Sequence, residues 1–139
     1  MTTLKAIRLG KGDDLKQFIT DFFTDQKMSS GVIVSAVGSL SKASLRMAGA
    51  QPDAQDIRNY DGHFEIVSLT GTVAGNGLHL HMAISDSEGV VFGGHLKEGC
   101  LVDTTVELVI ASDTELQFKR EVDQATGFDE LTIIEKNHD

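Results

Sequence analysis

Apolar and polar residues alternate along most of this chain, which is the pattern of β-strands with one buried face. The clearest case is LHLHMAIS at residues 78–85, in which every second side chain is large and apolar. A strand is also predicted over residues 63–77, and it ends in Asn76-Gly77, a dipeptide typical of a hairpin turn. The pattern therefore predicts two antiparallel strands joined near residue 76.

One segment near the N-terminus follows a helical period instead. Apolar residues recur at the spacing i, i+3, i+4, i+7 and i+8 in Leu15, Phe18, Ile19, Phe22 and Phe23. This spacing predicts an amphipathic helix over about residues 14–27, with Asp13 as its N-cap.

Further strands are predicted at 3–9, 31–40, 41–48, 90–96, 102–112, 114–122 and 131–135. The run at 31–40 is almost continuously apolar, which is typical of a strand covered on both faces. Residues 49–62 and 123–130 are expected to be loops, and residues 137–139 to fray. One helix and about eight strands, mostly joined by hairpins, predict an α+β fold with a predominantly antiparallel sheet in a single domain, residues 1–139.

Three of the five histidines fall in one stretch, Gly77 to Leu96. His79 and His81 project from the strand face opposite the apolar residues. The turn at residues 86–89 brings the next strand back, so that His95 lies within reach of the pair; Gly93-Gly94 before it predicts a weakened or bulged strand. Three imidazoles from two adjacent strands can occupy three corners of a zinc tetrahedron. The stretch predicts a metal site at these histidines, from one chain or two, with ordinary exposed histidines as the alternative.

A metal at this position would serve one of two purposes. An open site activates a bound water by lowering its pKa to about 7, whereas a site closed by a fourth ligand is structural. Glu65 and Glu107 are the candidate carboxylates, and each is equally a solvated residue. The sequence leaves open whether the protein is an enzyme: a metal-dependent hydrolase or lyase on a small molecule is the alternative to ligand binding or assembly.

Composition limits the partners. The formal net charge is −9, and the twelve Lys and Arg residues are scattered, with Lys119-Arg120 the one adjacent pair. Because sequence-independent binding of nucleic acid depends on basic residues that neutralise phosphates, this distribution disfavours direct nucleic-acid binding. No stretch is apolar enough to span a membrane, and the N-terminal segment lacks the apolar core of a signal peptide. A lone cysteine, Cys100, fits a reducing compartment, so a cytoplasmic location is expected.

Four segments of the chain resemble, in order and spacing, the PPC domain, which follows AT-hook motifs in plant nuclear proteins and stands alone in prokaryotes. The segments are RLGKGDDLKQFI, GVIVSAVGSLSKASLR, FEIVSLTGTV and GLHLHMAISDSEGVVFGGHLKEGCLVDTTVELVI. The resemblance covers about residues 4–122 and is to the stand-alone prokaryotic type.

The resemblance implies a mainly antiparallel α+β fold and a homotrimer. In stand-alone members the matching H-x-H and G-G-H elements look like a metal-binding set, which implies zinc as the cofactor at His79, His81 and His95. Plant relatives lack these histidines, so the fold does not require the metal. DNA contact in the plant proteins belongs to a basic segment containing Arg-Gly-Arg, which this chain lacks. Prokaryotic members are often labelled DNA-binding by association with these plant proteins, so a DNA-associated regulator without its own AT-hook is a further alternative. The label itself is no evidence that this domain contacts DNA.

Overall fold

Eight strands and one helix make up residues 1–136, the part of the chain that this computed structural model describes. In chain order they are β1 (Thr2–Gly10), α1 (Leu15–Asp25), β2 (Gly31–Arg46), β3 (Ile57–Ala74), β4 (Gly77–Ser85), β5 (Val91–Leu96), β6 (Leu101–Asp113), β7 (Leu116–Val122) and β8 (Asp129–Glu135). Every strand pairing within these residues is antiparallel. The predicted α+β class is confirmed, and the expected fraying of residues 137–139 lies outside the described residues.

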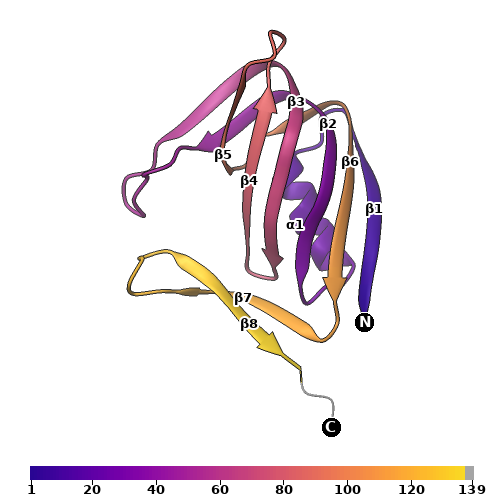
Figure 1. Cartoon of the computed structure of the whole chain (residues 1–139), viewed down its shortest axis with the longest axis vertical. Helices are drawn as coiled ribbons and strands as arrows, with labels where there is room; N and C mark the ends of the chain where they lie inside the picture. The colour runs from indigo at the N-terminus through magenta and orange to yellow at the C-terminus, as the bar shows by residue number, and fades with distance from the viewer. Residues whose placement is uncertain (137–139) are drawn as a thin grey trace.

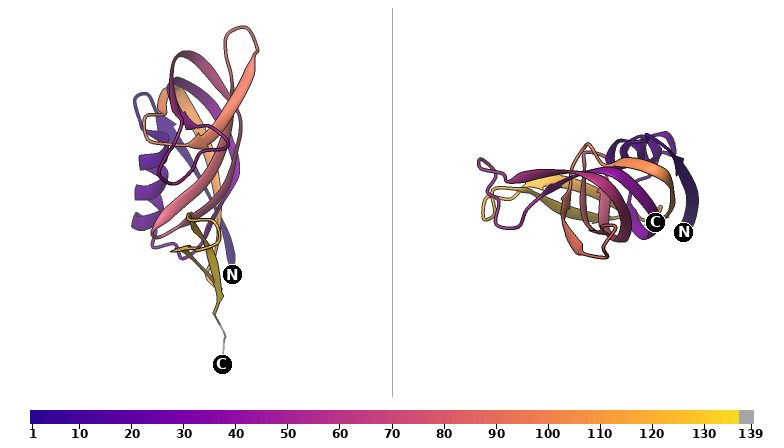
Figure 2. Two further views of the ribbon diagram at one scale, coloured as in Figure 1. Left: turned by 90° about the vertical axis from the view of Figure 1, so that its left-hand side faces the viewer. Right: turned by 90° about the horizontal axis from the view of Figure 1, so that it is seen from above.

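Six strands form one sheet in the order β1-β6-β2-β3-β4-β5, and β7 pairs with β8 in a separate hairpin. Helix α1 lies against one face of the large sheet, and the β7–β8 hairpin crosses the sheet end where β3 turns into β4 (Figures 1 and 2). The C-terminal end of β2 pairs additionally with β5, through Leu45–Leu96 and Arg46–His95. This second pairing curls β2, β3, β4 and β5 into a closed end of the sheet.

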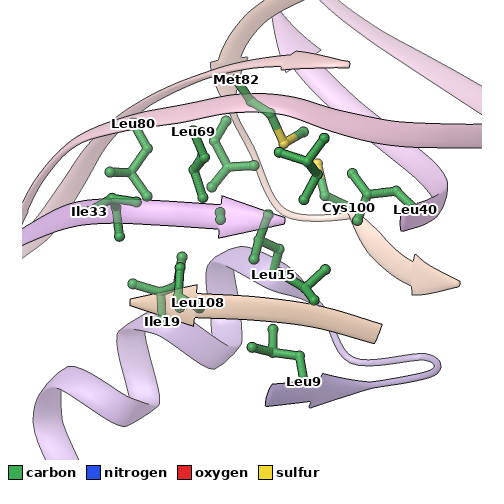
Figure 3. Close-up of a cluster of buried hydrophobic side chains, with 14 of the residues drawn as sticks. Leu9, Leu15, Ile19, Ile33, Leu40, Leu69, Leu80, Met82, Cys100 and Leu108 are labelled. Carbon is green, nitrogen blue, oxygen red and sulfur yellow. The ribbon is translucent and has the colours of Figure 1, made fainter. Parts of the chain in front are cut away.

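The hydrophobic core lies between α1 and the sheet. Leu15, Ile19 and Phe23 form the buried side of α1, and the period predicted from sequence is confirmed. Figure 3 shows Leu15 and Ile19 gathered with buried side chains of the strands, among them Leu9 and Leu108. Each fully buried side chain of this size stabilises the fold by about 1.5–3 kcal/mol relative to exposure. The core therefore fixes which face of each strand points away from the helix.

The N-cap of α1 lies one residue later than the sequence predicts. Asp14 is the N-cap, and its carboxylate accepts hydrogen bonds from the backbone N–H of Gln17 (3.1 Å) and of Gly99 (2.7 Å). The Asp13 carboxylate accepts instead from the backbone N–H of Gly10 (2.9 Å) and closes the turn after β1. Two adjacent aspartates thus divide the two tasks, and the prediction of Asp13 as N-cap is wrong.

Several strand boundaries also differ from the predicted ones. Residues 31–40 and 41–48 belong to one long strand, β2, and β3 begins at Ile57, so the predicted 49–62 loop is shorter. The hairpin turn is Gly75-Asn76, because Ala74 pairs with Gly77, one residue earlier than the Asn76-Gly77 dipeptide indicates. The β4–β5 register runs without a shift, so of the two alternatives predicted at Gly93-Gly94, a weakened or a bulged strand, the bulge is wrong.

The apolar run of β2 is covered on one face within this chain. Ile33 is 6% exposed and faces the core, whereas Val34 and Val37 are 55% and 59% exposed on the opposite face. The prediction of a strand covered on both faces is therefore wrong for the single chain. Across the described part of the chain, no helix has the length and apolarity that crossing a lipid bilayer requires.

Candidate metal centre

A row of polar side chains crosses three strands on the sheet face away from α1. His81 of β4 pairs in register with His95 of β5, and His95 pairs with Arg46 of β2. Directly opposed residues of antiparallel strands point to the same face, so these three side chains are neighbours. His79, two residues before His81, points the same way and extends the row toward the β3–β4 turn. The curled end of the sheet thus brings residues from distant segments together.

The three histidines converge as the sequence predicts, and all three come from one chain. The Nε2 atoms of His79 and His81 are 3.2 Å apart, and one ligand nitrogen from each of the three rings lies within 4.8 Å of the others. Tetrahedral zinc with bonds of 2.0–2.1 Å needs ligand nitrogens roughly 3.3 Å apart. The donor set and its spacing therefore fit a zinc ion after small side-chain rotations.

Two glycines allow β5 to approach its neighbours closely enough for this arrangement. A Cβ at Gly93 would lie 2.2 Å from the carbonyl oxygen of Met82, and one at Gly94 would lie 2.6 Å from the carbonyl oxygen of Arg46. Both separations are shorter than any non-bonded contact, so a side chain at either position would push β5 away. The double glycine before His95 is required for close packing rather than for a bulge.

The protonation state of two of the three histidines favours metal binding. Burial, followed by the positive charge of Arg46, lowers the pKa of His95 from 6.5 to about 3. Desolvation, followed by the neighbouring His81, lowers the pKa of His79 as well. A metal ion requires the free lone pair of a neutral imidazole. At neutral pH these two rings are already in the form that binds a metal.

Neither carboxylate suggested by the sequence lies at the cluster. Glu65 pairs with Ser85, four residues along β4 from His81, and Glu107 lies on β6 opposite Arg8. The carboxylates that share a pocket with His79 and His95 are Asp129 and Glu130, at the start of β8. The sequence placed residues 123–130 in a loop and gave no indication that this loop folds back over the histidines.

Two pockets flank the histidines. One of about 380 Å³ is lined by Thr70, His81 and Ala83, and one of about 270 Å³ is lined by His79, Arg120 and Glu130. Arg46, His95 and Phe128 line both. Strand alternation places Arg46 on the polar side of β2, which is a weak sequence signal; Arg120 and Phe128 carry none, because their position depends on how the β7–β8 hairpin docks.

The sequence matches one known protein family over most of its length. The model of the Plants and Prokaryotes Conserved (PCC) domain matches residues 2–114. The chain belongs to this family. The resemblance to the PPC domain is thereby confirmed, and the described histidines all lie inside the matched region, whereas β7 and β8 lie beyond it.

Similar sequences occur inside longer proteins. The chain is 43% identical over 127 residues to the bifunctional protein GlmU of Synechococcus sp. (strain JA-3-3Ab), a match that covers 91% of this chain and 20% of that protein. It is 29% identical over 118 residues to AT-hook motif nuclear-localized protein 8 of Arabidopsis thaliana, covering 79% of this chain and 30% of that protein. The chain thus spans about a fifth to a third of the length of these curated relatives.

Solved structures share the whole fold. A protein from Salmonella enterica is 36% identical, with a TM-score of 0.92 over 99% of this chain and 96% of that one. A protein from Archaeoglobus fulgidus, described as metal-containing, is 23% identical, with a TM-score of 0.82 over 94% of this chain and 93% of that one. Both matches cover nearly the full length of the two chains.

Proposed function

We propose that this PCC-domain protein binds one divalent metal ion, zinc, through His79, His81 and His95. The observation that carries the proposal is the convergence of three imidazole nitrogens within 4.8 Å on one face of the sheet. Imidazole nitrogens in a set of three are typical ligands of zinc, with a fourth position left for water or a ligand. The role of the ion is to hold a small ligand or to support assembly.

The surroundings of the histidines support the same proposal. The two Nε2 atoms of His79 and His81 face each other at hydrogen-bond distance, an arrangement in which one proton serves two lone pairs. A bound cation would use both lone pairs at once. The related fold from Archaeoglobus fulgidus is described as metal-containing, which is consistent with metal binding by this architecture.

Metal analysis of protein purified without a histidine tag tests the proposal. We expect one zinc per chain by inductively coupled plasma mass spectrometry after dialysis. His79→Ala and His81→Ala each lose the ion, because two imidazoles bind zinc far more weakly than three. His63→Ala is the matched control, since the His63 side chain is 87% exposed and lies outside the cluster. Absence of stoichiometric metal from the unaltered protein would refute the proposal.

The second part of the proposal is a homotrimer. Val34, Val37 and Val67 are 55%, 59% and 55% exposed on the sheet face away from α1, on the adjacent strands β2 and β3. Exposed large apolar side chains on adjacent strands are what a protein–protein interface would cover. Self-association through it would also place a neighbouring chain beside the histidine row.

Light scattering tests the assembly. We expect a mass three times the 15.0 kDa of the monomer. Val37→Glu places a charge in the proposed interface and reduces the mass to that of the monomer. Val122→Glu is the matched control, because Val122 is 71% exposed on β7, away from this face. A monomeric mass for the unaltered protein would contradict the homotrimer.

A cytoplasmic location completes the proposal, because Cys100 is a free buried thiol and the chain has no second cysteine.

Direct binding to nucleic acid is not part of the proposal. The formal net charge of −9 opposes association with phosphates. A gel-shift titration at moderate salt, with micromolar protein, tests this point, and a shift with bare DNA would reopen the DNA-associated alternative.

A further inference from the structure

The two pockets beside the histidines adjoin each other, because both are lined by Arg46, His95 and Phe128. We propose that together they form a receptor for a small oxyanion, a carboxylate or phosphate group held between the bound metal and the guanidinium groups of Arg46 and Arg120. The inference rests on the proposed metal function and goes beyond it by naming the chemical class of the ligand.

Arg120 provides the first argument. Its side chain is 8% exposed, and its Nη2 donates a hydrogen bond to the Thr72 hydroxyl (2.6 Å). Its Nε has no hydrogen-bond partner although it is buried, and the residue lines the same pocket as His79. A buried charged donor without an acceptor is costly, so Arg120 is incompletely paired, and an anion in the pocket that contacts its guanidinium offsets part of this cost.

The position of Arg120 is fixed rather than adventitious. The Asn76 side chain donates to the Arg120 carbonyl (2.8 Å) and accepts from the Arg120 backbone N–H (2.8 Å). Asn76 belongs to the β3–β4 turn, so these two bonds tie the β7 strand to the strand that carries His79 and His81. These bonds fix the backbone of Arg120, and the Nη2 bond to Thr72, which pairs with His79, directs the guanidinium toward the histidine strand.

Arg46 provides the second argument, through the chemistry of His95. Its Nη2 lies 3.3 Å from the Nδ1 of His95, and since a guanidinium has no acceptor, Nδ1 must accept the bond. If His95 coordinates the metal through Nε2, its proton moves to Nδ1; if it coordinates through Nδ1, that lone pair is used. In both cases the hydrogen bond from Arg46 is lost, so metal binding releases the Arg46 donors for a ligand.

The released guanidinium remains at the pocket. Its central carbon lies 5.3 Å from the centre of the Phe128 ring, so a cation–π contact holds it over the hairpin. Neither Arg46 nor Arg120 forms an ion pair with a carboxylate within the described part of the chain. Both guanidiniums therefore have hydrogen-bond donors left for an external anion.

The charge of the pocket selects the ligand class. Asp129 and Glu130 line the same pocket as Arg120, and the Glu130 carboxylate accepts a weak bond from the Thr126 hydroxyl (3.3 Å). These two carboxylates offset the two guanidiniums. A bound divalent ion then leaves an excess of positive charge, which an oxyanion balances and a cationic or neutral ligand does not. Planar guanidiniums match the geometry of carboxylate and phosphate oxygens.

The residues of the two pockets come from two different parts of the chain. The histidines and Arg46 lie within the region matched by the family, residues 2–114, whereas Arg120, Phe128 and Glu130 belong to the hairpin beyond it. The metal position therefore lies within the matched domain, and the C-terminal hairpin adds Arg120 and Glu130 to Arg46 at the ligand pocket.

Calorimetric titration of protein loaded with one zinc per chain tests the inference. Inorganic phosphate and malonate are titrated separately at constant ionic strength, and we expect saturable one-to-one binding of at least one of them; the stronger arm identifies phosphate or carboxylate. Arg46→Gln and Arg120→Met weaken that binding by about tenfold or more, the loss typical of a charged hydrogen bond. Arg8→Gln is the matched control, because Arg8 is exposed on β1, at the opposite edge of the sheet.

Zinc content, measured first on each protein, separates the two proposals. Protein that takes up no zinc overturns the metal proposal and this inference with it. Two results overturn the inference and leave the metal proposal intact. In the first, protein with one zinc per chain binds neither anion. In the second, it binds an anion equally well after both arginine changes. If Arg120→Met disturbs folding, as judged by circular dichroism, Arg46→Gln carries the test.

Discussion

Alternate side chains of β4 face two different environments. Leu80, Met82 and Ile84 are 1%, 2% and 0% exposed and belong to the hydrophobic core. His79 and His81 are exposed on the opposite face, beside His95 of β5. Because successive side chains of a strand point to opposite sides, one nine-residue segment forms both the core and the candidate metal centre.

The difference between the faces indicates how stability and binding are divided. The core face is enclosed by α1 and neighbouring strands, so any lost atom leaves a cavity. On the histidine face the side chains of His79 and His81 are exposed, so they contribute little to folding in the absence of metal. Changes on one face should therefore affect folding and changes on the other should affect binding, and four experiments test this separation.

The largest effect is expected on the core face. Ile84→Ala lowers the free energy of unfolding of the metal-free protein by about 2–5 kcal/mol, because it removes buried methyl groups and leaves a cavity. Urea denaturation measures the loss. His81→Ala, on the other face of the same strand, changes the same quantity by less than about 0.5 kcal/mol. Equal losses at both positions would contradict the division between the faces.

The next effect concerns the metal. Zinc at one hundred times its dissociation constant raises the free energy of unfolding of the unaltered protein by about 2.7 kcal/mol. His81→Ala, measured at the same zinc concentration, gains nothing, because the ligand set is incomplete. His63→Ala keeps the full gain. Thermal melts with and without zinc measure the difference, and a full gain in His81→Ala would exclude His81 as a ligand.

Both faces of β4 could be predicted from the sequence because the information is local. Alternation assigns Leu80 and His81 to opposite sides, and a short turn before β5 brings His95 back within reach. The same reasoning predicted the helix and most strands. It misplaced the N-cap by one residue, because Asp13 and Asp14 are equally good caps and the choice depends on the contact between Asp14 and Gly99.

The remainder of the site depends on contacts between distant segments. Arg120 reaches the histidines because Asn76, 44 residues earlier, binds its backbone, and nothing in the local sequence of either residue indicates this pairing. Glu130 follows from the same docking, which is why the sequence directed attention to Glu65 and Glu107 instead. The sequence also could not show that β5 pairs with both β4 and β2, which places Arg46 beside His95.

The third experiment uses pH. The folded protein holds the pKa of His95 at about 3, below its ordinary value of 6.5, chiefly by burial. As the pH falls, the unfolded chain therefore binds the proton first, so the contribution of neutral His95 to stability is complete above pH 6.5 and is lost as the pH falls toward 3.

His95→Gln removes this titration, so the metal-free variant loses less stability than the unaltered protein between about pH 7 and about pH 5, where most carboxylates stay ionised. Denaturation at the two pH values measures the difference. Identical losses in both proteins would mean that His95 is more solvated than its place between β4 and β2 indicates, and would weaken the contrast between this partly buried ring and the exposed pair.

The smallest effect is expected for Cys100, a side chain capable of metal binding that lies on the core side. It is 0% exposed, and its Sγ accepts a hydrogen bond from the Ser44 backbone N–H (3.3 Å). Burial raises the pKa of this thiol from 9.0 to about 11, so the folded protein keeps the thiol neutral. The contribution of the neutral thiol to stability is therefore present below pH 9 and is lost as the pH rises through 11. Since thiolates react and bind metals, we expect no labelling by a thiol reagent near pH 8 without denaturant, and an unchanged zinc content in Cys100→Ala. Loss of zinc in that variant would place a core residue in the metal chemistry and end the separation of the two faces.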